Sequence, residues 1–120
     1  MKGKLKTIAL WLLQILLALV FVNVGRDKFT SENWPARFHH WGYPDHFHLV
    51  VGFLEAVGGL ALLVPRATFY GAATLGVVML GAAATHLLHA EFRQFTSPLV
   101  FLVLLGIVLY ARRPESLGRG

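Results

Sequence analysis

The stretch FLEAVGGLALLVPR, residues 53–66, has the composition of a membrane span with one exception, the carboxylate of Glu55. A carboxylate in the middle of a span is costly unless it is paired, hydrogen-bonded or protonated. Such groups therefore face the interior of a helical bundle or a polar cavity rather than lipid. We expect the same of Glu55, with a basic or histidine side chain within direct or water-mediated reach.

The helical neighbours of Glu55 support this orientation. Residues three and four positions away on a helix share its face, and here they are Val51, Gly52, Gly58 and Gly59. Small residues allow a second helix to approach closely, so a stripe with three glycines should face another helix. The stripe therefore predicts that Glu55 lies at a helix–helix contact.

The whole chain has the composition of a membrane protein. Of its 120 residues, 56% are hydrophobic and only 14% are charged, which is far from the average of soluble domains. The formal net charge of +5 is concentrated at the chain ends and in loops, a pattern that indicates membrane orientation rather than nucleic-acid binding. The chain has no cysteine, which excludes disulfides and thiolate metal ligands.

Four apolar segments predict an all-α fold, a four-helix transmembrane bundle in a single domain over residues 1–120. A span needs roughly 17–25 residues, and the segments are 7–24, 46–64, 67–88 and 97–112. The last has the shortest apolar core and needs flanking residues such as Phe95 and Arg112 to cross.

Basic residues predict the orientation. Seven Lys and Arg fall on the side of the termini and four on the other side. The bias favours both termini in the cytoplasm. The expected setting is the bacterial cytoplasmic (inner) membrane. The two groups are Lys2, Lys4, Lys6, Arg66, Arg112, Arg113 and Arg119 against Arg26, Lys28, Arg37 and Arg93.

The first external loop contains NWPARFHHWGYP, residues 33–44, which predicts a short interfacial amphipathic helix. Pro35 stands near its start, and Trp34, Phe38 and Trp41 recur at helical spacing on one face. Two interpretations stay open. The aromatic face either anchors the chain in the interface, as aromatic belts do, or forms a lid over a ligand.

Polar residues are predicted to gather in the outer half of the bundle, beneath that helix. Glu55 and His86 are the candidate catalytic residues, as groups that could exchange protons, and His86 should stand about two helical turns above Glu55. Alternatively, Glu55 only pins two helices by pairing with Arg26 or Lys28. The inner half offers Gln14 and terminal basic residues, which suit lipid headgroups. The candidate ligand-binding residues are Asn23, Arg26, Lys28, Glu55, His86 and His89.

No metal site is expected. His39, His40, His46 and His48 could bind a metal adventitiously, but the sequence fixes no set of strong ligands. A phosphate-binding loop, a dinucleotide-binding glycine turn and a serine nucleophile elbow are all missing from the sequence.

Four short motifs resemble, in their order, those of the DoxX-like membrane proteins. They are GRDK at 25–28, WGYP at 41–44, EAVGGLALLVPR at 55–66 and AAATHLLH at 82–89. The family comprises small four-helix proteins named after a subunit of an archaeal terminal quinol oxidase and thiosulfate:quinone oxidoreductase system. Lys28, Glu55 and His86 occupy the polar positions of these motifs.

The resemblance implies a small subunit of a membrane redox or quinone-linked complex. Its expected partners are membrane lipids, other membrane or redox subunits and a quinone-like small molecule, with a quinone as the candidate cofactor and no nucleic acid. Two alternatives stay open: a non-catalytic structural or accessory subunit, and a lipid- or sterol-modifying four-helix membrane enzyme.

Overall fold

The computed structural model describes residues 2–114, and these form five helices and no strand. The predicted all-α class is therefore confirmed. The helices are α1 (Lys2–Thr30), α2 (Asn33–His40), α3 (Phe47–Ala61), α4 (Thr68–Leu88) and α5 (Phe92–Ala111). The predicted loop helix is present as α2, with Phe38 buried on its inner face.

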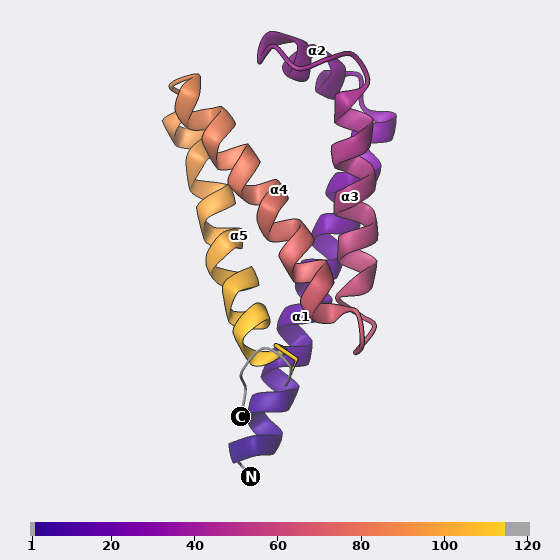
Figure 1. Cartoon of the computed structure of the whole chain (residues 1–120), viewed down its shortest axis with the longest axis vertical. Coiled ribbons are helices and arrows are strands. Elements are labelled where there is room, and N and C mark those ends of the chain that lie inside the picture. Colours follow the sequence, from indigo (N-terminus) through magenta and orange to yellow (C-terminus); the bar gives the residue numbers. More distant parts are fainter. Residues whose placement is uncertain (1, 115–120) are drawn as a thin grey trace.

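The four long helices form two antiparallel pairs, α1 with α3 and α4 with α5 (Figure 1). The pairs converge at the end where α1 begins and α5 ends, and they separate toward the other end, which α2 covers (Figure 1). The start of α1 and the end of α5 thus lie at the same end of the molecule. Arg119, one residue in the orientation count, lies outside the described residues.

Three helices, α1, α4 and α5, are long and apolar enough to cross a membrane. The second predicted span, 46–64, is shorter in the structure because α3 has only 15 residues. Residues 62–67 form turns instead, since Pro65 disfavours helical geometry at the residue before it. At 1.5 Å per residue, α3 is about 22 Å long, against a hydrocarbon thickness of about 30 Å.

The last predicted span is longer in the structure than the sequence predicts. The sequence predicts helix over 97–112, but α5 begins five residues earlier, at Phe92, and is 20 residues long. Pro98 lies inside this helix and is buried. The first predicted span, 7–24, is also longer in the structure, because α1 continues through GRDK to Thr30.

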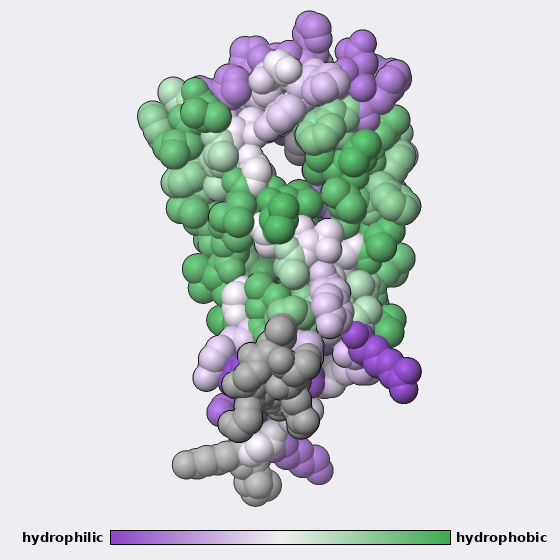
Figure 2. All heavy atoms as spheres, in the orientation of Figure 1, coloured by the Kyte–Doolittle hydropathy of each residue, from purple (hydrophilic) through white to green (hydrophobic). Residues whose placement is uncertain are grey.

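The hydrophobic core lies where the two pairs converge. Leu17, Leu62, Leu75, Leu105 and Val108 are fully buried there and come from α1, the α3–α4 turn, α4 and α5. Many other large apolar side chains are exposed, and Figure 2 shows them as a broad hydrophobic band between two hydrophilic ends. An apolar outer band of this kind suits contact with lipid.

A buried polar network ties the helices together at the converging end. Gln14 is fully buried. Its Nε2 donates to the Leu62 carbonyl at 2.8 Å, and its Oε1 accepts from Arg112 Nε at 2.8 Å. Thr68 Oγ1 donates to the same carbonyl at 3.2 Å. The expectation that Gln14 and the terminal basic residues serve lipid headgroups is thus wrong for Gln14 and Arg112, because tertiary packing brings them together.

Candidate functional site

A cavity of about 510 Å³ lies between the two helix pairs at their separated end, with α2 over it. Its opening is visible in the space-filling view (Figure 2). Every helix contributes to its wall. The walls are mainly apolar and aromatic, as in ligand pockets, and include Phe21, Phe38, Phe47, Val51, Met79 and Phe101.

One wall carries an ion pair, Lys28 Nζ to Glu55 Oε1, at 2.7 Å. The two side chains are only 6% and 2% exposed, and both residues line the cavity. The predicted interior position of Glu55 and its basic partner are therefore confirmed. Between Arg26 and Lys28, the two partners considered from sequence, the structure selects Lys28.

Glycines explain why this pair can form. A Cβ on Gly25 would lie 2.5 Å from the Gly52 carbonyl oxygen, and one on Gly52 would lie 2.8 Å from Lys28 Cβ. The backbones of α1 and α3 therefore touch at these glycines. Because α1 and α3 are antiparallel, Lys28 lies beside Gly52, and Glu55 lies one helical turn further along α3, within reach of the lysine side chain.

A second polar cluster lies at the far end of α4. His86 Nδ1 is 2.9 Å from Glu91 Oε1, and Trp41 Nε1 donates to the same oxygen at 3.1 Å. The hydrogen bond with His86 is the main cause that holds the pKa of Glu91 below its usual value, and that from Trp41 adds to it. Thr85 shares a hydrogen bond with the Tyr43 hydroxyl.

An unusual backbone turn places Glu91 beside His86. Ala90 has φ +56°, a left-handed conformation that favours glycine. The turn lets the Glu91 amide donate to the His86 carbonyl at 2.8 Å, and its side chain folds back over α4. His86 therefore pairs with Glu91 at the α4–α5 turn rather than with Glu55.

The predicted lid residues Trp34, Phe38 and Trp41 all line the cavity. Phe38 contacts both tryptophan rings, at centroid distances of 6.1 and 5.4 Å. Lys28 Nζ lies 3.9 Å from the Trp34 ring centroid, which links the ion pair to α2. The aromatic face thus covers the cavity instead of pointing away from the bundle.

Three predicted ligand-binding residues lie apart from this cavity. Asn23 is exposed, and its side chain donates to the Leu19 carbonyl of its own helix. Arg26 is exposed on α1. His89 is exposed too, with its ring 6.2 Å from that of His40. The structure brings together Lys28, Glu55 and His86 with the three aromatic residues.

The site also includes three residues that were not predicted from the sequence, namely Arg37, Tyr43 and Glu91. Arg37 and Tyr43 line the cavity, and Glu91 holds His86 and Trp41. Arg37 and Tyr43 lie within the stretch singled out for its aromatic residues, so their proximity to the lid was a usable signal. The remaining histidines form no metal site: within residues 2–114 no group of three or more His, Asp or Glu is placed to hold an ion.

A known protein family matches the part of the chain that contains these cavity residues. The profile of the DoxX-like family matches residues 12–108, which include all four motifs and every residue that lines the cavity. The chain belongs to the DoxX-like family. Its long apolar helices and its family together identify a membrane protein with transmembrane helices. Neither the curated proteins nor the solved structures include a significant match.

Proposed function

We propose that this DoxX-like protein binds a quinone-like amphiphile in the cavity beneath α2, as a small subunit of a membrane redox or quinone-linked complex. The observation that carries the proposal is the Lys28–Glu55 ion pair, which lies in the wall of a largely apolar cavity. A ring with polar oxygens needs apolar walls and a few convergent polar groups, and both are present.

The residues fit such a ligand by their chemistry. Aromatic side chains of α1, α2 and α5 offer contact surfaces for a ring, and an apolar chain could leave between the separated helix pairs. Lys28 Nζ and His86 are hydrogen-bond donors for carbonyl oxygens, and Glu55 can accept or return a proton. A bound quinone would supply two-electron, two-proton redox chemistry, with electrons exchanged with a partner redox subunit.

A structural role is the competing function, and the glycine contact favours it. Because Gly25 and Gly52 already bring α1 and α3 together, the ion pair could serve only to fix their register. The chain would then be an accessory subunit without a ligand. The variant Glu55→Gln separates the two: a structural pair predicts lower stability with ligand affinity kept, whereas a ligand-binding pair predicts the loss of affinity.

Tryptophan fluorescence tests the binding directly. Trp34 and Trp41 line the cavity, whereas Trp11 lies at the other end, beneath Arg112. An alkyl naphthoquinone titrated into the protein in zwitterionic nanodiscs should quench fluorescence saturably. Quenching should persist in Trp11→Phe and disappear in the double variant Trp34→Phe, Trp41→Phe. The absence of saturable quenching, or its survival in the double variant, would refute the proposal.

The proposed setting is the bacterial cytoplasmic membrane with both termini in the cytoplasm. The Lys and Arg bias supports it, as does the position of the start of α1 and the end of α5 at one end of the bundle. The cavity then opens in the outer half of the membrane. Reporter fusions at the two ends should both report a cytoplasmic location. External signals from both would reverse the orientation, and an external signal from only one would contradict the placement of both ends on one side.

A further inference from the structure

Arg37 is an exposed charged residue at the edge of the cavity, and it forms no ion pair with another described residue. Lys28 is paired with Glu55, and His86 with Glu91. No carboxylate within residues 2–114 forms an ion pair with Arg37, although it lines the cavity. Its guanidinium instead lies near two indole rings, 4.7 Å from the centroid of Trp34 and 5.3 Å from that of Trp41.

No neighbouring acid among residues 2–114 forms an ion pair with this charge. The nearest acid on α1 in this arrangement, Asp27, accepts a hydrogen bond from Trp34 Nε1 at 2.7 Å. Because Lys28 and Glu55 cancel, the charges in the wall leave one net positive charge. A positive charge at the edge of an apolar cavity attracts anions, since low-dielectric walls strengthen its field.

The chemistry of arginine makes this position suitable for an acid group. Guanidinium is planar and always charged, and its donors match the two oxygens of a carboxylate or phosphate. Contact with the Trp34 and Trp41 rings restricts the orientation of the Arg37 guanidinium group. Less conformational freedom of this side chain is therefore lost when an anion binds.

We propose that the cavity selects an anionic amphiphile, whose ionised acid group binds Arg37 beneath α2 and whose apolar body lies among Phe21, Met79 and Phe101. The inference rests on the proposed function and narrows its ligand class. The anion can be an acidic ring hydroxyl or carboxylate of a free small molecule, or the phosphate of an anionic membrane lipid.

A matched pair of probes tests this selection. One is a 3-alkyl-2-hydroxy-1,4-naphthoquinone, whose acidic hydroxyl is ionised at neutral pH, and the other is its neutral methyl ether. In zwitterionic nanodiscs, the acid should bind wild type more tightly than the ether. Arg37→Gln should weaken acid binding roughly 10-fold, the scale of one charge-assisted hydrogen-bonded contact, and leave ether binding unchanged.

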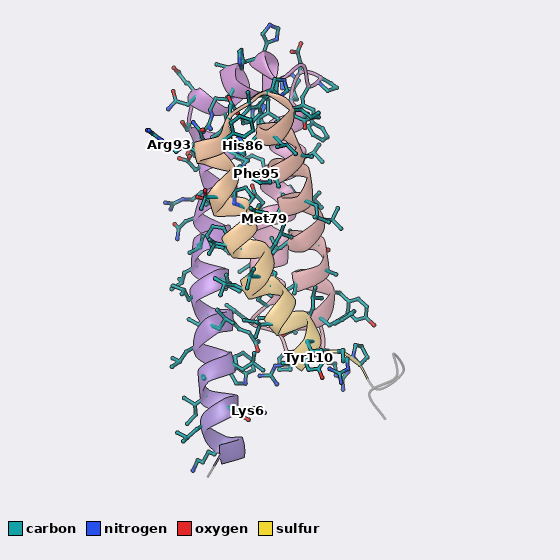
Figure 3. All side chains as sticks on the ribbon, turned by 90° about the vertical axis from the view of Figure 1, so that its left-hand side faces the viewer. Lys6, Met79, His86, Arg93, Phe95 and Tyr110 are labelled. Atoms are coloured by element: carbon teal, nitrogen blue, oxygen red, sulfur yellow. The ribbon has the colours of Figure 1, made fainter. Side chains whose placement is uncertain are left out.

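Two control variants and an unfolding measurement separate the effect of the Arg37 charge on affinity from an effect on folding. Arg93→Gln removes an exposed arginine at the same end of the molecule, which does not line the cavity and points away from the bundle (Figure 3), and it should change neither affinity. Arg37→Lys keeps the positive charge but lacks the planar guanidinium that binds two oxygens at once, so it should give an intermediate affinity for the acid. Thermal unfolding of each variant should match wild type.

The outcomes are distinct for the two proposals. Equal affinities of wild type for acid and ether, or an equal loss of both in Arg37→Gln, would overturn the anion selection while leaving quinone-like binding intact. Binding of neither probe would overturn both. Competition by added phosphatidylglycerol in wild type, but not in Arg37→Gln, would support the anion site and identify a lipid headgroup as the source. Absence of competition with acid binding intact would support a free acid.

Discussion

The two ends of the bundle use buried polar side chains in opposite ways. At the converging end, Gln14, Thr68 and Arg112 bind one another and the Leu62 carbonyl within packed protein. At the separated end, Lys28 and Glu55 are also buried, yet they form part of a cavity wall. A buried polar group alone therefore indicates a structural role as readily as a functional one, and the space beside it distinguishes the two.

The geometry of the helices creates that difference. Arg112 reaches Gln14 because α1 and α5 meet at the converging end. Toward α2 the pairs separate (Figure 1). Side chains from α1 and α5 line one cavity there. His86 and Met79 lie within this upper region (Figure 3).

Breaking the ion pair should have the largest effect. Lys28→Met leaves the buried Glu55 without its partner and should destabilise the fold by about 3–5 kcal/mol. Chemical unfolding in detergent micelles measures this. Adding Glu55→Leu should recover most of the stability, because an apolar pair has no charge to desolvate. The double variant should still fail to bind the naphthoquinone. Normal stability of Lys28→Met would contradict the burial of an unpaired Glu55. Normal ligand binding by the double variant would contradict the role of this ion pair in the ligand cavity.

Disrupting the converging end should reduce stability without touching the ligand. Gln14→Leu removes the acceptor of Arg112 Nε and one of the donors to the Leu62 carbonyl. The expected cost is about 1–3 kcal/mol, the penalty for buried polar groups left unsatisfied. Naphthoquinone affinity, measured below the unfolding transition, should equal that of wild type. A parallel fall in affinity would show that the two ends are coupled.

The glycine contact between α1 and α3 gives a third test. In Gly25→Ala the new Cβ would lie 2.5 Å from the Gly52 oxygen and 2.7 Å from the Ala56 nitrogen, both backbone atoms. One helix must shift, at a cost of about 1–3 kcal/mol, and the Lys28–Glu55 distance must change. Gly106→Ala is the matched control, because its Cβ meets nothing within 4 Å. It should be neutral or slightly stabilising in the same unfolding assay, and equal behaviour of the two variants would disprove the close contact.

Local patterns predicted the features that depend on one helix or one helix pair. The apolar segments gave the helices, the aromatic spacing gave α2, and the glycine stripe gave the interior position of Glu55. Each of these follows from periodicity along a single element. Basic residues near the end of the first segment also gave Lys28 as one of two possible partners.

Features that depend on tilt and turn geometry were not predictable in this way. The contact of Gln14 with Arg112 joins residues 98 positions apart and requires α1 and α5 to converge. Glu91 reaches His86 only through the left-handed conformation of Ala90, a residue that rarely adopts it. The early end of α3, finally, depends on Pro65, whose effect the apolar pattern concealed.

The smallest expected effect is that of acidic pH on the contact between Trp41 at the end of α2 and Glu91 in the α4–α5 turn. The pKa of Glu91 is lowered by hydrogen bonds with His86 and Trp41, and by the nearby His40 when it is charged. For a carboxyl group with a lowered folded-state pKa, the stabilisation is fully present above the ordinary carboxyl pKa. It is lost as the pH falls through the lowered value. Protonated Glu91 is a weaker hydrogen-bond acceptor than the carboxylate, so acid should loosen Trp41 from Glu91 while the rest of the fold persists.

The fluorescence of Trp41, in a background with Trp11→Phe and Trp34→Phe, should report this release as a single transition at acidic pH. Glu91→Gln keeps an oxygen that can accept from Trp41 Nε1 but cannot ionise, so its fluorescence should stay constant over the same range. Glu32→Gln, at an exposed acid before α2, is the control and should keep the wild-type transition. An acid transition that survives in Glu91→Gln would place the responsible group elsewhere. A transition lost only in that variant would show that the α2 end is held by titratable contacts, whereas the neutral Gln14 contacts at the converging end should not respond to acid.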